Sequence, residues 1–95
     1  MGGFQWDEEK NKWLKAHRSI SFEEIAIRIE SGDLVTVLEN DKPQYAGQFI
    51  AVLRIDDYAW AVPYRDSEDG KWLITAFPSR ALTKLHLRRG HDDEP

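Results

Sequence analysis

A group of cations near the end of the chain has the spacing that most suggests chemistry. Arg80, Lys84, Arg88 and Arg89 lie within ten residues that contain no acidic side chain. In a helix, the first three would stand four residues apart on one face, an arrangement suited to phosphate contacts. The same pattern also fits a solvated face whose cations lie near the negative end of the helix dipole. Both interpretations stay open.

Three further residues with chemical potential lie in the middle of the chain. Arg54 is the single charged residue of an apolar segment. Its side chain either reaches into a concave site or extends its guanidinium group to water. Tyr64 and Arg65 end the next predicted strand, beside a polar loop. A tyrosine there can transfer a proton or stack on a base, although packing within the sheet is the simpler explanation.

The histidines show no spacing typical of a metal site. His86 lies in the basic segment and is a candidate proton-transfer group, whereas His17 is more simply a structural residue that bonds a helix-terminal carbonyl. The chain has no cysteine, so thiolate metal sites and thiol nucleophiles are excluded. It also lacks the glycine-rich motifs of nucleotide-binding proteins. We expect neither a metal nor a cofactor.

Length and charge limit the class of protein further. A chain of 95 residues forms one domain, predicted over residues 1–90, with 91–95 as an acidic flexible tail. The net charge of -4 argues against a general nucleic-acid coat protein but permits a local basic patch.

No apolar run approaches the roughly 20 residues of a membrane span. We expect no membrane partner and a cytoplasmic location.

Helix signals lie at both ends of the chain. Asp7 is a typical N-cap for a helix over 7–17, and Ser21 with Glu24 forms a capping box for a helix over 22–31. Gly32 is a typical stop for the second helix. A third helix is predicted from Ser79 to Gly90. Its expected core residues are Ala81, Leu82 and Leu85.

Strand signals occupy the middle of the chain. Four β-branched or alternating segments predict strands over 34–38, 49–55, 59–64 and 72–77. The consecutive strands and short turns indicate an α+β fold, with two N-terminal helices, a four-stranded mainly antiparallel sheet and a C-terminal helix. All helices are expected on one face of this sheet.

The N-terminal residues resemble a known family. Phe4-Gln-Trp-Asp7, a lysine-containing helix, His17 and Ile20-Ser-Phe-Glu-Glu24 follow in the order typical of BrnT-type toxins. The resemblance covers most of residues 4–89. It implies a RelE/BrnT-like fold and an endoribonuclease toxin of a type II toxin–antitoxin system. RNA and a cognate antitoxin, in a hetero-oligomer with the toxin, are the partners it implies.

A ribonuclease without a metal uses the 2′-hydroxyl of the RNA itself. It needs a base for that proton, cations for the phosphate charge and an acid for the leaving oxygen. On this hypothesis the catalytic candidates are Arg54, Tyr64, Arg65, Arg80 and His86. The RNA-binding candidates are Lys84, Arg88 and Arg89. The alternative is a non-catalytic protein-binding module that uses the same sheet and basic helix.

Overall fold

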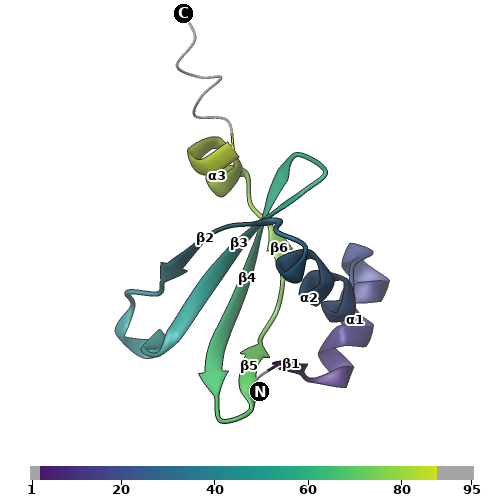
Figure 1. Cartoon of the computed structure of the whole chain (residues 1–95), viewed down its shortest axis with the longest axis vertical. Helices are drawn as coiled ribbons and strands as arrows, with labels where there is room; N and C mark the ends of the chain where they lie inside the picture. Colours follow the sequence, from purple (N-terminus) through teal and green to yellow (C-terminus); the bar gives the residue numbers. More distant parts are fainter. Residues whose placement is uncertain (1–2, 88–95) are drawn as a thin grey trace, which may run out of the picture.

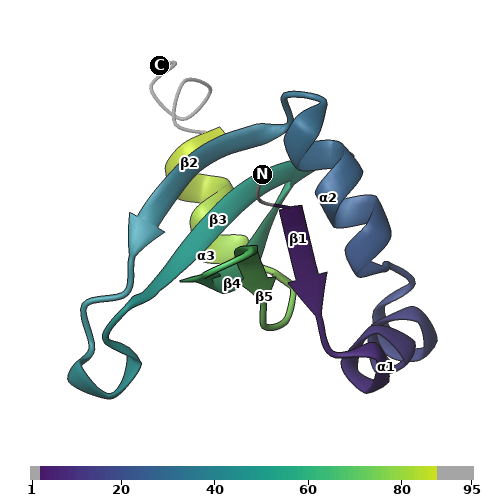
Figure 2. The ribbon, with the colours of Figure 1, turned by 60° about the horizontal axis from the view of Figure 1, so that its bottom comes forward.

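The computed structural model describes residues 3–87 and has an α+β fold in which one sheet carries helices on both faces (Figures 1 and 2). Arg88, Arg89 and the predicted tail 91–95 lie outside the described residues. The elements in chain order are β1 (Gly3–Trp6), α1 (Glu8–Arg18), α2 (Phe22–Glu30), β2 (Leu34–Glu39), the 3-10 turn η1 (Pro43–Tyr45), β3 (Gln48–Ile55), β4 (Tyr58–Ser67), β5 (Gly70–Leu73), β6 (Phe77–Pro78), α3 (Arg80–Leu82) and the π-helical turn η2 (Thr83–Leu87).

The two N-terminal helices begin at the predicted caps. The Asp7 carboxylate accepts a hydrogen bond from the backbone N–H of Glu9 at 3.2 Å. The Ser21 hydroxyl accepts one from the backbone N–H of Glu24 at 3.1 Å. Each cap satisfies an amide that has no partner within its helix. The helical predictions for this part of the chain are confirmed to within one residue at each end.

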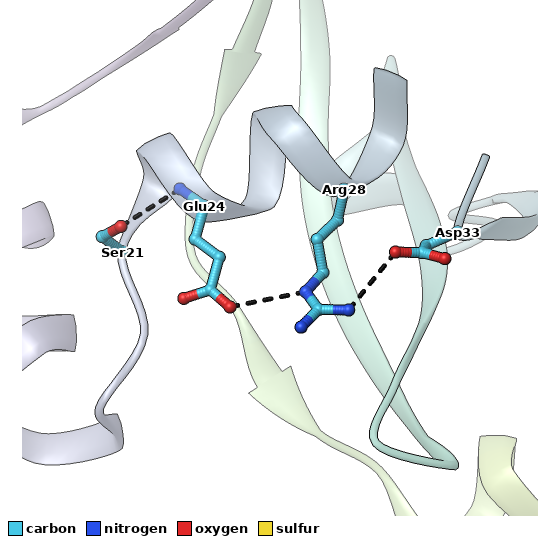
Figure 3. Close-up of polar contacts among 4 residues, drawn as sticks. All are labelled: Ser21, Glu24, Arg28 and Asp33. Carbon is cyan, nitrogen blue, oxygen red and sulfur yellow. Dashed lines mark hydrogen bonds and ion pairs between the residues drawn. The ribbon is translucent and has the colours of Figure 1, made fainter. Parts of the chain in front are cut away.

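In a full capping box the Glu24 side chain would also bond back to the backbone N–H of Ser21. Here the Glu24 carboxylate instead takes part in a chain of ion pairs. The Glu24 carboxylate pairs with Arg28 at 3.4 Å, and Arg28 also reaches Asp33 at 3.3 Å (Figure 3). The backbone N–H of Asp33 donates to the carbonyl of Arg28, and Gly32 before it has φ +95°. This backbone geometry ends α2 as the glycine signal predicts.

The sheet has six strands in place of the four predicted. The strand order is β1-β5-β4-β3-β2, and β6 pairs with β4 outside this path. β1 lies parallel to β5, whereas the other pairs are antiparallel. At the β1–β5 contact, Gly70 has φ +141° and a Cβ there would overlap the backbone of Gly3. The predicted strand over 72–77 is wrong in its middle, because 74–76 leave the sheet to reach β6.

The main core lies between the sheet and the two N-terminal helices. Phe22 and Ile25 of α2 are fully buried in one cluster with Ala51 and Leu53 of β3. Ile29 packs against this cluster as a partly buried residue. The apolar face of α2 therefore packs on the central strand β3.

The third helix packs on the opposite face of the sheet, so the expectation of helices on one face is wrong (Figure 2). Val52, Ala59 and Ala61 are buried outside the main cluster, where α3 and η2 contact β4. The Thr83 hydroxyl accepts a hydrogen bond from the backbone N–H of Ala59 at 2.8 Å and donates to the carbonyl of Ser79 at 2.7 Å. These bonds fix the helix to β4.

The predicted core face of the C-terminal helix is also wrong. Ala81 is exposed, Leu82 is half-buried and 56% of Leu85 is exposed, whereas Thr83 is buried. The hydrogen bonds of Thr83 turn that residue toward β4. The chain then continues as a π-helical turn, which does not keep the α-helical spacing from which the apolar face was predicted.

Candidate functional site

An open groove of about 550 Å³ lies where β4, β5 and the start of α1 meet. Gln48, Arg65 and Trp72 are register partners on three adjacent strands, so their side chains emerge on one face. The parallel pairing of Trp6 with Leu73 brings the beginning of α1 to the end of β5. The residues lining the groove are Asp7, Lys10, Gln48, Arg65, Trp72, Leu73 and Ile74.

Arg65 has the strongest potential for binding an anion in this groove. Its guanidinium carbon lies 5.6 Å from the centre of the Trp72 ring, within the range of a cation–π contact. Among residues 3–87 no carboxylate pairs with it, whereas Lys71 on the adjacent strand bonds Asp66 at 2.8 Å. That bond raises the pKa of Lys71. The charge of Arg65 is therefore available to an anion.

The start of α1 supplies a carboxylate and a second cation to the groove. Asp7 and Lys10 both line it, one helical turn apart. Asp7 already accepts the capping hydrogen bond of α1, which fixes the position of its carboxylate. The Lys10 ammonium lies 4.4 Å from the centre of the Trp13 ring. The groove thus combines two cations, a carboxylate, an amide and an indole, which suit a phosphate and a base of a nucleic acid.

The structure separates the residues predicted to act together. Arg65 lies in the groove, but Tyr64 is buried on the opposite face, where it stacks on Phe49 with ring centres 5.6 Å apart. Arg54 lies at the other end of β3, where its guanidinium is 3.9 Å from the Asp57 carboxylate. Of the predicted catalytic residues, the groove therefore contains Arg65 alone.

The remaining candidates lie on or near the C-terminal helix. Arg80 and Lys84 are exposed there, so both are accessible to a partner. The Nε2 atom of His86 is buried and has no hydrogen-bond partner in the described structure. Outside this helix, His17 bonds the carbonyl of Trp13 at 3.0 Å and stacks on its ring, as expected of a structural residue.

Sequence reasoning missed Asp7, Lys10, Gln48 and Trp72 as site residues. In the sequence, Asp7 is fully accounted for as a helix cap, and Trp72 as a residue of a predicted strand. Their proximity depends on β1, a strand of four residues that the sequence pattern did not predict. The available signal was the Trp-Asp-x-x-Lys spacing at residues 6–10, which places an acid and a cation one helical turn apart.

Within residues 3–87, no group of three or more potential ligands among His, Cys, Asp and Glu gathers to hold a metal ion. No helix of the same part of the chain is long and apolar enough to cross a membrane. Comparisons with family models, curated proteins and solved structures give no match to this chain. Membership of the BrnT-type toxins therefore stays a prediction.

Proposed function

We propose that this protein is the toxin component of a toxin–antitoxin pair, with a RelE/BrnT-like fold, and that it cleaves single-stranded RNA in the groove beside α1. The observation that carries the proposal is the presence of Arg65, Lys10, Asp7 and Trp72 around one open groove. The N-terminal resemblance to BrnT-type toxins supports the same function. A cognate antitoxin would neutralise the protein by forming a complex with it.

Each of four groove residues has its own role in the proposed reaction. The Asp7 carboxylate accepts the proton of a ribose 2′-hydroxyl, whose oxygen then forms a bond to the adjacent phosphorus. The bond from phosphorus to the 5′-oxygen breaks, and the Lys10 ammonium donates a proton to that oxygen. Arg65 stabilises the charge on the phosphate, and Trp72 stacks on a base. The products carry a 2′,3′-cyclic phosphate and a 5′-hydroxyl.

The test is cleavage of a labelled single-stranded RNA, in the presence of a metal chelator, by the wild type and by Asp7→Asn. Asparagine caps a helix as well as aspartate does but does not accept a proton. Cleavage should fall by about 10²- to 10⁴-fold, the usual contribution of one proton-transfer group. Thermal unfolding should change little.

The double variant Arg80→Gln/Lys84→Gln is the control, since both residues lie outside the groove. It should cleave as the wild type does, whereas Arg65→Gln should lose both binding and cleavage. Full activity of Asp7→Asn would overturn the assigned mechanism. A wild type that neither binds nor cleaves RNA would overturn the proposed function.

A second candidate function is protein binding without catalysis. The edge strand β2 exposes Leu34, Val35 and Val37. Strand edges with exposed apolar side chains are surfaces to which another chain can add a strand. This function is favoured if the purified protein leaves RNA intact and does not bind it.

A further inference from the structure

The helix α1 carries four cations after its two acidic residues. Residues 10–18 include Lys10, Lys12, Lys15 and Arg18 and no acidic residue, although the whole chain is acidic. The acidic residues of α1 lie in its first turn. The helix therefore presents local positive charge next to the groove, where the net charge of the chain predicts none.

Two of these cations, Lys10 and Arg18, lie around one aromatic ring. The Lys10 ammonium lies 4.4 Å, and the Arg18 guanidinium carbon 4.7 Å, from the centre of the Trp13 ring. The His17 ring stacks on Trp13 with centres 4.5 Å apart and planes 18° apart. Lys10, Trp13, His17 and Arg18 are named the α1 strip. Lys10 also lines the groove, so the strip and the groove are continuous.

The strip has the chemistry of a nucleotide-binding surface. His17 is exposed, so a base can extend the Trp13–His17 stack. Arg18 is held in place by donating to the carbonyl of Ala76, and Lys10 is held over the indole. Two cations beside an aromatic stack match the phosphate and the base of one nucleotide. An apolar protein interface would instead require further hydrophobic side chains, and Trp13 is the one large hydrophobic residue exposed on α1.

We infer that the α1 strip is a second nucleotide subsite, which binds single-stranded RNA as it leaves the groove. The inference rests on the proposed function of the groove. The base stacks on His17 and Arg18 contacts a phosphate beside it, while Lys10 lies where the strip joins the groove. A dinucleotide fills the groove alone, whereas a longer RNA occupies both sites.

The direct test is nuclear magnetic resonance of the wild-type protein, following the indole N–H signals of Trp13 and Trp72. The probes are a dinucleotide and a dodecamer of oligouridylate, both 2′-O-methylated so that the 2′-oxygen cannot attack. The Trp72 signal should shift with both probes, and the Trp13 signal with the dodecamer alone. A shift of Trp72 alone with the dodecamer overturns the inference and keeps the groove. An unchanged Trp72 signal overturns the proposed function as well.

A variant pair gives the second measurement. His17→Ala should weaken dodecamer binding by about tenfold, as expected for the loss of one stacked base. It should leave dinucleotide binding within about twofold, because His17 does not line the groove. Lys15→Ala is the matched control on the same helix, since Lys15 lies toward Glu23 of α2 and away from the strip. If Lys15→Ala weakened dodecamer binding as much as His17→Ala does, the proposed subsite would be wrong. Binding would then depend on the positive charge of the helix and not on the stacked ring of His17.

Discussion

At the scale of single residues, Asn11 of α1 connects the two N-terminal helices through its hydrogen bonds to α2. It is fully buried. Its side-chain amide donates to the Glu23 carboxylate at 2.8 Å, and its side-chain oxygen accepts the backbone N–H of Phe22 at 2.8 Å. A buried polar side chain is tolerated only when it is hydrogen-bonded in this way. Asn11 thus sets how the start of α2 meets α1, which together with its cap supplies Lys10 and Asp7 to the candidate site.

Replacement of Asn11 should therefore be costly. In Asn11→Leu the side chain keeps a similar size, but the N–H of Phe22 loses its partner in a buried position. We expect a loss of about 1–3 kcal/mol in the free energy of unfolding, the usual cost of an unsatisfied buried group. Urea unfolding measures it. Lys12→Leu on the exposed side of the same helix should stay within about 0.5 kcal/mol. Equal stability of Asn11→Leu and the wild type would show that this bond contributes nothing.

The same contact predicts a dependence of stability on pH. The hydrogen bond from Asn11 is the largest cause that lowers the pKa of Glu23 below its ordinary value of 4.5. A carboxyl whose pKa is lowered by folding stabilises the protein above its unfolded pKa. That stability is lost as the pH falls below 4.5 toward the folded pKa.

The measurement is urea unfolding of the wild type and of Glu23→Gln, at neutral pH and at about pH 3. Glutamine still accepts the bond from Asn11 but does not titrate. The wild type should therefore lose more stability on acidification than the variant does. Identical losses would show that Glu23 makes no contribution to the acid sensitivity of the protein.

At the scale of elements, the β3–β4 hairpin is closed by a turn with unusual backbone angles. Asp56 and Asp57 have φ of 54° and 65°, and the strands resume pairing at once with Ile55 opposite Tyr58. Two residues with positive φ are typical of a type I′ turn, which prefers glycine at its second position. The hairpin tolerates aspartate at both positions at a cost in backbone strain.

Asp57→Gly should therefore stabilise the protein by about 0.5–1 kcal/mol, since relief of the strain exceeds the added entropy of the unfolded chain. The pair with Arg54 that the change removes is exposed and contributes little. Thermal unfolding measures the gain. Glu68→Gly is the control, because Glu68 is exposed and is not among the residues with positive φ. It should lose stability. A loss in both variants would refute the argument from strain.

The elements also show which features a sequence can predict. The caps at Asp7 and Ser21 and the stop at Gly32 depend on contacts within a few residues, so local patterns predict them. β1 becomes a strand only through its pairing with β5, far along the chain. The orientation of η2 depends on the bond between Thr83 and Ala59. Such contacts leave no periodic pattern. For this reason β1 was not predicted, and the core face of the C-terminal helix was predicted wrongly.

Like the fold, the candidate site could be predicted from the sequence only in part. Arg65 was identified from its place at a strand end beside a polar loop. Tyr64 was grouped with it, yet neighbouring residues of a strand point to opposite faces, and Tyr64 is buried. The partners of Arg65 in the groove come from α1 and β5, which only the tertiary structure brings together.

At the scale of the whole molecule, exposed cations gather at two sites. The groove and the α1 strip carry Lys10, Arg18 and Arg65. Arg80 and Lys84 are exposed on the C-terminal helix, which packs on the face of β4 from which Arg65 also emerges, but neither residue lines the groove. An acidic chain with such patches avoids general binding to nucleic acid, while each patch still attracts phosphate locally.

The proposed ribonuclease activity predicts how the protein acts in a cell. Expression of the chain without a partner should slow the growth of a bacterial host and deplete its RNA, because the groove would be open to single-stranded RNA. Asp7→Asn should restore growth at equal amounts of soluble protein, since it keeps the helix cap and removes the base. Arg80→Gln/Lys84→Gln should stay toxic, because these cations lie outside the groove. Growth curves and total RNA, measured after induction of each variant, provide the comparison. Normal growth and intact RNA with soluble wild-type protein would contradict the ribonuclease and favour the protein-binding function of the β2 edge.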